Sequence, residues 1–293
     1  MSDPNSAARR AADDPAAAGM PVIEFRGVTK GFDDDVVLRD ISVHISRGET
    51  IIILGASGSG KSTILKLILG LIRPDLGKIL IDEQDITGML DRDLVAIRRK
   101  IGMVFQEGAL FDSLSVRENV GYRLYEEGKM SEEEIESAVL RLLGFVGLED
   151  AIDKMPAELS GGMKRRVGLA RALVGNPRVI LYDEPTAGLD PITKQTIVDL
   201  MIKLRDLEGV TTIFVTHDLA AAALIATEYA TAQEDGNVRF RSSGDELCLL
   251  NVRFVLLNEG RIGFEGSYQE LKASNDSYVQ KFLARRSGGG MPE

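Results

Sequence analysis

Two segments of this 293-residue chain carry side chains suited to phosphate chemistry. The first is a glycine-rich run that ends in a lysine and a serine, Gly55-Ala56-Ser57-Gly58-Ser59-Gly60-Lys61-Ser62. Glycines let backbone N–H groups converge on phosphate oxygens, and a helix that begins there adds partial positive charge. The lysine supplies a cation for the β- and γ-phosphates, the Ser62 hydroxyl can hold Mg²⁺, and Thr63 offers a further donor. The predicted nucleotide contacts are Gly55, Ser57, Gly58, Ser59, Gly60, Lys61, Ser62 and Thr63.

The second segment is an apolar run that ends in two carboxylates, Val179-Ile180-Leu181-Tyr182-Asp183-Glu184. Such a run predicts a buried strand, and two acids at a strand end often form only a turn. In a chain that also has the glycine-rich loop, we expect Asp183 to hold Mg²⁺ through water. Glu184 is placed to polarise an attacking water as a general base, which predicts hydrolysis of the bound nucleotide.

A parallel sheet between helices would position these residues. Residues 50–54 form a short apolar run directly before the glycine-rich loop, and a helix is expected over residues 61–71. Further strands are predicted at residues 22–25, 36–45, 77–82, 101–105, 211–215 and 254–257, and further helices at residues 91–99, 131–143 and 191–207. Strands that alternate with helices predict an α/β fold. The mostly helical stretch of about residues 110–165 predicts an inserted subdomain.

A third segment, Leu159-Ser160-Gly161-Gly162-Met163, lies roughly a hundred residues after the glycine-rich loop and about twenty before Asp183. The order of the three segments resembles the ATP-binding cassette (ABC) family, and the resemblance covers about residues 22–284. It implies an α/β P-loop NTPase (RecA-like) core with an antiparallel β subdomain and an inserted α-helical ABC signature subdomain. It also implies that the chain binds ATP and Mg²⁺ and hydrolyses ATP.

The resemblance implies a homodimer, because each ATP in this family is clamped between the glycine-rich loop of one subunit and the Ser-Gly-Gly loop of another. Ser160, Gly161 and Gly162 would then complete the ATP site of a second copy of the chain. The helix that begins after them directs its N-terminal partial positive charge at the γ-phosphate. Asp190 matches the loop that joins the two sites across the dimer.

Three further residues acquire roles only through the resemblance. Gln106 matches a glutamine that reaches Mg²⁺ and the attacking water while its loop touches a membrane subunit. His217 matches the residue that contacts the γ-phosphate, and Phe32 matches an aromatic residue that stacks on adenine, with packing beside Phe25 as the alternative. The expected catalytic residues are Lys61, Gln106, Glu184 and His217. The expected Mg²⁺ site comprises Ser62, Gln106 and Asp183.

Three details narrow the branch of the family. The Ser-Gly-Gly loop ends in Met163, where most members have glutamine, and three basic residues follow it. Residues 181–185 read Leu-Tyr-Asp-Glu-Pro and residues 187–191 read Ala-Gly-Leu-Asp-Pro. Residues 108–116 read Gly-Ala-Leu-Phe-Asp-Ser-Leu-Ser-Val. Together these resemble the ATPase subunit of bacterial systems that shuttle phospholipid between inner and outer membranes with mammalian-cell-entry (MCE) proteins. The implied partners are an integral membrane permease dimer, an MCE-type substrate-binding protein and accessory subunits. Arg117 and residues 121–123 depart from that branch near the expected permease-docking groove.

Three other functions stay open at this point. The first is an importer ATPase for a small polar solute such as an amino acid. The second is a soluble ABC protein of translation or DNA repair, which usually carries tandem cassettes, long coiled-coil insertions or basic surfaces. The third is a non-hydrolytic regulatory module, which conflicts with the presence of Glu184 and His217.

Composition limits the partners and the compartment. The net charge of −10 argues against a nucleic-acid partner. Cys248 is the only cysteine, which excludes an intrachain disulfide and fits a reducing compartment. No apolar run approaches the roughly 18 residues of a membrane span. Any association with a membrane must then come through a partner. With the permease that the resemblance implies, we expect a peripheral protein on the cytoplasmic face of the bacterial inner membrane.

The expected organisation is one nucleotide-binding domain over residues 21–286, with a disordered leader at residues 1–20 and a flexible tail at residues 287–293. An atypical insert at about residues 228–251 contains a possible short strand at residues 238–241 and is either a surface loop or a contact with a partner or dimer mate. The basic residues of the helix after Gly162 are interpreted as a solvated face without a catalytic role. They are Lys164, Arg165, Arg166 and Arg171.

Overall fold

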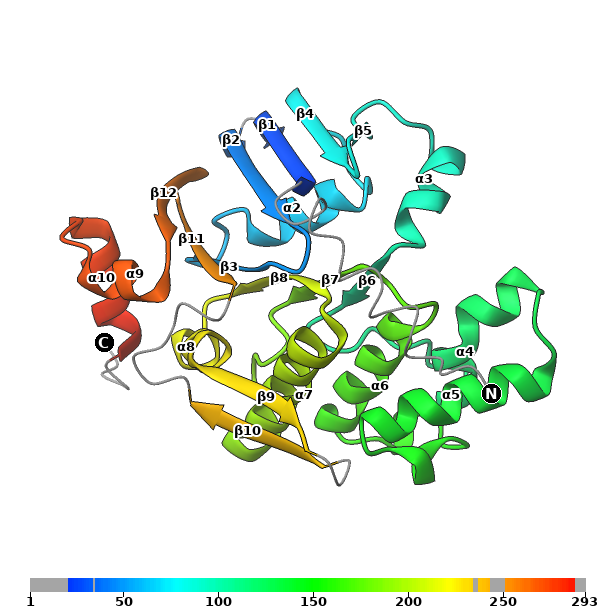
Figure 1. The fold of residues 1–293 in the computed structure, drawn as a ribbon. Helices are drawn as coiled ribbons and strands as arrows, with labels where there is room; N and C mark the ends of the chain where they lie inside the picture. Colours follow the sequence, from blue (N-terminus) through cyan, green and yellow to red (C-terminus); the bar gives the residue numbers. More distant parts are fainter. Residues whose placement is uncertain (1–20, 34, 234–236, 243–250, 288–293) are drawn as a thin grey trace.

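The computed structural model describes residues 21–33, 35–233, 237–242 and 251–287. The predicted leader and nearly all of the predicted tail lie outside the described residues. A six-stranded sheet runs through the centre of the molecule in the order β12-β11-β3-β8-β7-β6 (Figure 1), and β12 is its only antiparallel strand in the described part. The strands are β3 Thr50–Gly55, β6 Ile101–Val104, β7 Val179–Asp183, β8 Thr211–Thr216, β11 Val252–Asn258 and β12 Arg261–Gly266.

The central strand β3 is buried along its whole length because layers cover both faces of the sheet. Side chains alternate between the faces of a strand, so neighbouring residues enter different cores. Ile51 and Ile53 join the core that contains α2 (Lys61–Ile68) and the antiparallel sheet. Ile52 and Leu54 join the core formed with the helices of the opposite face.

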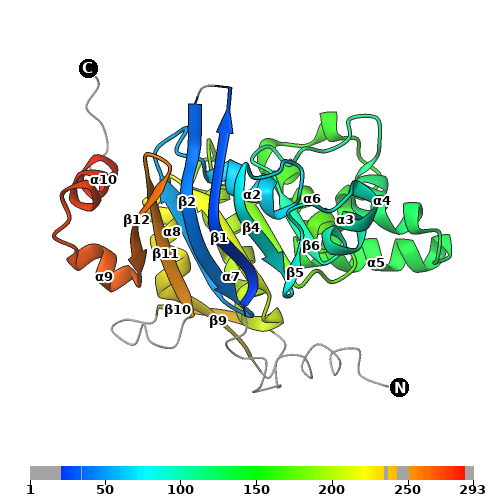
Figure 2. The same cartoon turned by 90° about the horizontal axis from the view of Figure 1, so that it is seen from above.

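An antiparallel sheet of order β2-β1-β4-β5 lies over α2 (Figures 1 and 2). Its strands are β1 Pro21–Phe32, β2 Asp35–Ser46, β4 Leu76–Ile81 and β5 Gln84–Asp85, and α3 Asp91–Arg98 follows them. Helix α2 ends at Ile68, earlier than expected, because Gly70 takes a left-handed backbone with φ of 61°. The expected antiparallel β subdomain is therefore present beside the α/β core.

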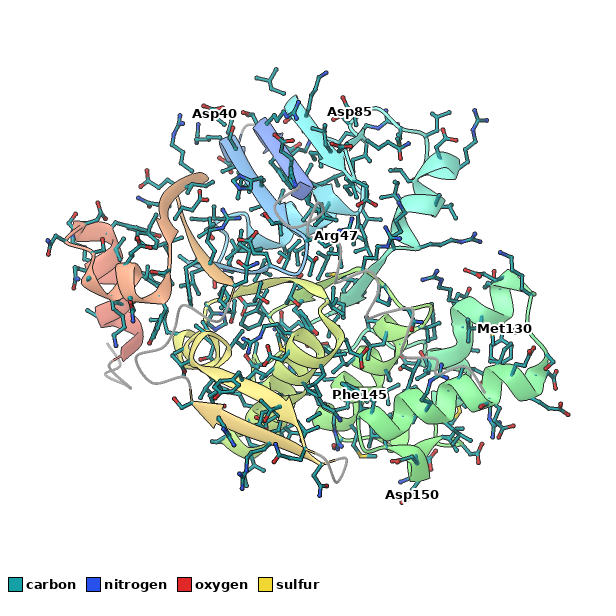
Figure 3. The ribbon with its side chains drawn as sticks, in the orientation of Figure 1. Asp40, Arg47, Asp85, Met130, Phe145 and Asp150 are labelled. Atoms are coloured by element: carbon teal, nitrogen blue, oxygen red, sulfur yellow. The ribbon has the colours of Figure 1, made fainter. Side chains whose placement is uncertain are left out.

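The helical region lies at one side of the molecule, as the view from above shows (Figure 2). It contains α4 Val116–Glu127, α5 Glu132–Phe145 and α6 Gly161–Leu173, with short 3₁₀ turns at Glu149–Ala151 and Pro156–Glu158. The capping box of Ser131 and Glu134 is confirmed at the start of α5. Phe145, labelled in Figure 3, ends α5 with Lys203 Nζ 4.4 Å from its ring centroid, which ties this region to α7.

The predicted insert contains a β-hairpin. Helices α7 Pro191–Glu208 and α8 Leu219–Thr227 lead into β9 Glu228–Ala232, which pairs with β10 Val238–Ser242. The strand expected at residues 238–241 is thus confirmed. The buried Arg205 of α7 donates to the backbone oxygen of Glu228, which fixes the start of the hairpin on α7. Residues 234–236 and 243–250 of the insert lie outside the described residues.

The chain ends at the far side of the sheet, opposite the helical region, with α9 Tyr268–Ala273 and α10 Ser277–Ser287 (Figure 2). Within the described ranges, no helix combines the length and the apolar character required to cross a membrane. The parallel strands β3, β8 and β7 are neighbours, with Leu54 opposite Thr216 and Asp183 opposite Val215. Because their carboxyl ends meet at one edge, the residues that follow them converge there.

Candidate functional site

The glycine-rich loop joins β3 to α2, as the sequence predicts. Gly60 caps the helix with a left-handed φ of 98°, and a Cβ at this position would lie 2.6 Å from Cδ2 of Leu38. Gly58 has φ of 80°, and a Cβ added to it would meet no atom of the described residues within 4 Å. Glycine is therefore required at residue 60 for packing and at residue 58 for backbone shape. Residues 56–58 are exposed, so their backbone is accessible to a ligand.

Lys61 and Ser62 face the carboxylates that follow β7. Lys61 Nζ donates to the backbone oxygens of Gly55 and Ala56 at 3.0 Å each, and it lies 3.6 Å from Oε1 of Glu184. The Ser62 hydroxyl donates to Oδ1 of Asp183 at 2.8 Å. Burial raises the pKa of the Asp183 carboxyl, and the hydrogen bond from Ser62 opposes that rise. The structure thus brings the two strand-end segments into direct contact.

Glu184 is held on both of its carboxylate oxygens by the end of β8. Oε2 accepts hydrogen bonds from the Thr216 hydroxyl at 3.1 Å and from the backbone N–H of His217 at 3.2 Å. Oε1 lies 2.9 Å from Nδ1 of His217. The backbone of Glu184 has φ of 48°, in the region that non-glycine residues seldom occupy. Lys61, Glu184 and His217 therefore meet at one point, although they come from three segments.

The hydroxyl and carboxylate oxygens beside Lys61 suit a magnesium ion that also binds phosphate oxygens. Ser62 and Asp183 supply one hydroxyl and one carboxylate, and the described residues contain no cluster of three or more histidine, cysteine or acidic side chains. Mg²⁺ is commonly held by one or two protein oxygens, substrate phosphates and water. The Ser59 hydroxyl is buried without a hydrogen-bond partner in the described part of the chain. It is a free donor for a phosphate oxygen.

Gln106 and Phe32 lie at the ends of strands but make no described side-chain contact with the carboxylates. Gln106 follows β6, the neighbour of β7, and its side chain is exposed. Phe32 ends β1 with 44% of its surface exposed, whereas Phe25 is 1% exposed in the core. That exposure argues against core packing beside Phe25. Adenine stacking by Phe32 and the role of Gln106 stay predictions.

The Ser-Gly-Gly loop begins α6 in the helical region. Ser160 is the N-cap, and its hydroxyl accepts a hydrogen bond from the Met163 N–H at 3.3 Å. Ser160 and Gly161 are exposed, and a Cβ on Gly161 would meet no atom of the described residues within 4 Å. Asp190 caps α7 by accepting from the N–H groups of Ile192 and Thr193. The exposed loop is accessible to a second copy of the chain.

The solvated-face interpretation of the basic residues on α6 is wrong for its three arginines. Arg165 is only 8% exposed and donates to the backbone oxygens of Gln106 and Ala187. Arg166 donates to the backbone oxygens of residues 146 and 147, and Arg171 to those of residues 108 and 109. Three guanidinium groups therefore bind neighbouring loops. These contacts form only because segments that are distant in the sequence pack against α6.

Thr216 is the functional residue that sequence reasoning missed. It is fully buried at the end of β8, and its hydroxyl binds Glu184. The sequence does carry a signal for Thr216, because it directly precedes His217, which the family resemblance places at the γ-phosphate. Arg165 carried no such signal, since its partners lie 59 and 22 residues away along the chain.

Comparison with known proteins agrees with this geometry. Residues 38–187 match the profile of the family described as ABC transporter. The chain is 39% identical to the intermembrane phospholipid transport system ATP-binding protein MlaF of Haemophilus influenzae, over 92% of both chains. It is 41% identical to the methionine import ATP-binding protein MetN of Corynebacterium efficiens, over 75% of this chain and 62% of that one.

Among solved structures, the fold is similar to a dimeric post-hydrolysis state of the ATP-binding cassette MJ0796 bound to ADP and Pi. The TM-score is 0.70 and the sequence identity 34%, with 84% of this chain and 98% of that chain covered.

Proposed function

The chain belongs to the ABC transporter family as an ATP-hydrolysing subunit, and we propose that its transporter moves phospholipid between the inner and outer membranes. The partners in this proposal are a permease dimer, an MCE-type substrate-binding protein and accessory subunits. The chain would lie on the cytoplasmic face of the bacterial inner membrane, held there by the permease. The contact of Lys61, Glu184 and His217 carries the ATPase part of the proposal.

Each residue at the meeting point has a role that its contacts support. The glycine-rich loop and Lys61 bind the phosphates, and Ser59 contributes its free hydroxyl. Ser62 and Asp183 would hold Mg²⁺, which would supply positive charge to the phosphate oxygens. Glu184 accepts a proton as water attacks the γ-phosphorus and the bond to the ADP oxygen breaks. His217 stabilises charge on the γ-phosphate, and Thr216 and the His217 N–H keep the Glu184 carboxylate in place.

The substrate proposal rests on how far the similarity to MlaF extends. The match to MlaF covers 92% of both chains, whereas the match to MetN covers 75% of this chain and 62% of MetN. The two matches have nearly equal sequence identity, so the larger share of both chains that is covered favours the similarity to MlaF. The MetN similarity keeps an importer ATPase for a small polar solute as the second candidate.

A pair of exposed aromatic residues supports permease docking beside Gln106. Phe111 and Tyr122 are 45% and 41% exposed, and their ring centroids lie 4.9 Å apart. Of the departures noted near the expected groove, Arg117 is used inside the chain, where it pairs with Glu136 and Asp153, whereas Tyr122 belongs to the exposed pair. The aromatic pair therefore remains available to a partner from the membrane.

Co-purification tests the transport proposal. The tagged chain is isolated from membranes of its source in mild detergent, and the proteins and lipids retained with it are identified by mass spectrometry. The control is Phe111→Ala, which removes an exposed aromatic side chain and should lose the permease without unfolding. We expect an integral membrane permease, an MCE-type protein and phospholipid with the native chain. A permease accompanied by a solute-binding protein and no enriched phospholipid would favour the second candidate.

A further inference from the structure

Arg165 joins three segments of the molecule through one guanidinium group. It lies on α6, five residues after the exposed Ser160. Its Nε donates to the backbone oxygen of Gln106 and its Nη2 to the backbone oxygen of Ala187. The first oxygen belongs to the loop after β6, and the second to the loop between Glu184 and Asp190. One side chain thus contacts both loops that flank the proposed site.

Burial of the charged Arg165 guanidinium costs free energy that an apolar side chain at the same position would not cost. It is 8% exposed, and burial lowers the pKa of its guanidinium. The negative charge of Glu107 opposes this lowering of the pKa, but burial has the larger effect. A buried cation satisfied by carbonyl oxygens is less favourable than a well-packed apolar side chain of similar volume. The arrangement therefore points to a role in fixing the two loops.

The contact between α6 and the Gln106 loop is close along its length. A Cβ on Gly108 would lie 2.6 Å from the backbone oxygen of Lys164, and one on Gly168 would lie 3.0 Å from Cα of Gly108. Arg171 donates to the backbone oxygens of Gly108 and Ala109 at 2.8 Å each. The backbone of residues 106–109 is therefore pressed onto α6 and held by two arginines, so the loop follows any displacement of the helix.

We propose that Arg165 is a positioning residue that fixes the Gln106 and Ala187 loops relative to the start of α6. When the Ser160 loop of one copy binds the ATP of a second copy, α6 is set in place, and Arg165 transmits that placement to Gln106 and to the loop after Glu184. Each chain then aligns its own catalytic groups according to the nucleotide held by its mate. This inference rests on the proposed function of Ser160 and Gln106.

Arg166 provides a matched control on the same helix. It is the next residue, and it also donates to backbone oxygens, but those of Val146 and Gly147, in the loop after α5. Substituting either arginine by Met keeps an unbranched apolar stem and removes the guanidinium. Arg165→Lys keeps a cation that can reach one carbonyl oxygen but not bind both in a fixed fork.

The test compares ATPase rates of the full chain carrying R165M, R165K or R166M, together with E184Q. We expect R165M to lower kcat about tenfold with an unchanged KM for ATP, since misplacement of catalytic groups acts on the reaction more than on binding. R165K should recover part of kcat, and R166M should keep kcat while its thermal midpoint falls as far as that of R165M. Equal kcat in R165M and R166M would refute the proposal, as would no recovery in R165K. E184Q reports separately on the site, because turnover retained in E184Q would overturn the proposed function whatever Arg165 does.

Discussion

Glu184 depends on its neighbours for both its position and its reactivity. Thr216, the N–H of His217 and the His217 ring together hold its two oxygens, and Lys61 lies 3.6 Å away. A general base must be held within hydrogen-bond reach of the water that it activates. At the scale of single residues, the proposed catalytic carboxylate is therefore oriented by the end of a neighbouring strand, and its orientation can be altered without changing its charge.

Replacing Thr216 by Val tests that orientation. The change removes the hydroxyl that binds Glu184 and leaves the N–H of Asp218 without the acceptor that it has in Thr216. We expect kcat to fall about tenfold with little change in KM for ATP, and the free energy of unfolding to fall by about 1–3 kcal/mol. Steady-state kinetics and urea unfolding measure the two effects. Thr216→Ser keeps the hydroxyl and should restore both, and a T216V enzyme with native kcat would show that Thr216 does not position the base.

At the scale of elements, the loop between β6 and α4 is shaped by one fully buried side chain. Asn119 of α4 accepts a hydrogen bond from the Phe111 N–H at 2.8 Å and donates to the backbone oxygens of Phe111 and Leu114. Those contacts fix the loop that carries the exposed Phe111. The element that we expect to meet the permease is thus ordered from inside the helical region.

Asn119→Ala should weaken both the fold and the docking. Buried backbone groups at Phe111 and Leu114 would lose their partner, so we expect the free energy of unfolding to fall by about 1–3 kcal/mol. The permease retained on purification should fall as well, because Phe111 loses its fixed position. Phe111→Ala separates the effects, since it should reduce the retained permease with native stability. Native permease retention in both variants would place the docking surface elsewhere.

Features formed by residues close together in the sequence are predictable, whereas features formed by contacts between distant segments are not. The glycine-rich loop, the strand before Asp183 and the capping box at Ser131 are local patterns, and each forms where the sequence predicts it. The helix expected over residues 61–71 ends earlier, at Ile68, because Gly70 takes a left-handed backbone conformation. Burial of Arg165 was not predictable, because a helix face becomes interior only when a loop 59 residues away packs on it.

At the scale of the whole molecule, the two proposed halves of an ATP site lie in different regions of one chain. Lys61 and Glu184 gather at the edge of the central sheet, whereas Ser160 and Gly161 are exposed at the start of α6 in the helical region. An exposed Ser-Gly-Gly loop with open space around Gly161 is suited to contact another copy. We therefore expect the complete ATP site to form between two copies of the chain.

The most direct measurement of that claim is the mass of E184Q in solution with and without ATP and Mg²⁺, by size-exclusion chromatography with light scattering. Glutamine cannot accept the proton, so ATP should bind without turnover and hold two copies together. We predict a monomer near 31.9 kDa without ATP and twice that mass with it. Adding Gly161→Asp, which places a carboxylate where the phosphate of the second copy is expected, should abolish the dimer. E184Q that binds ATP yet stays at the monomer mass would contradict the account.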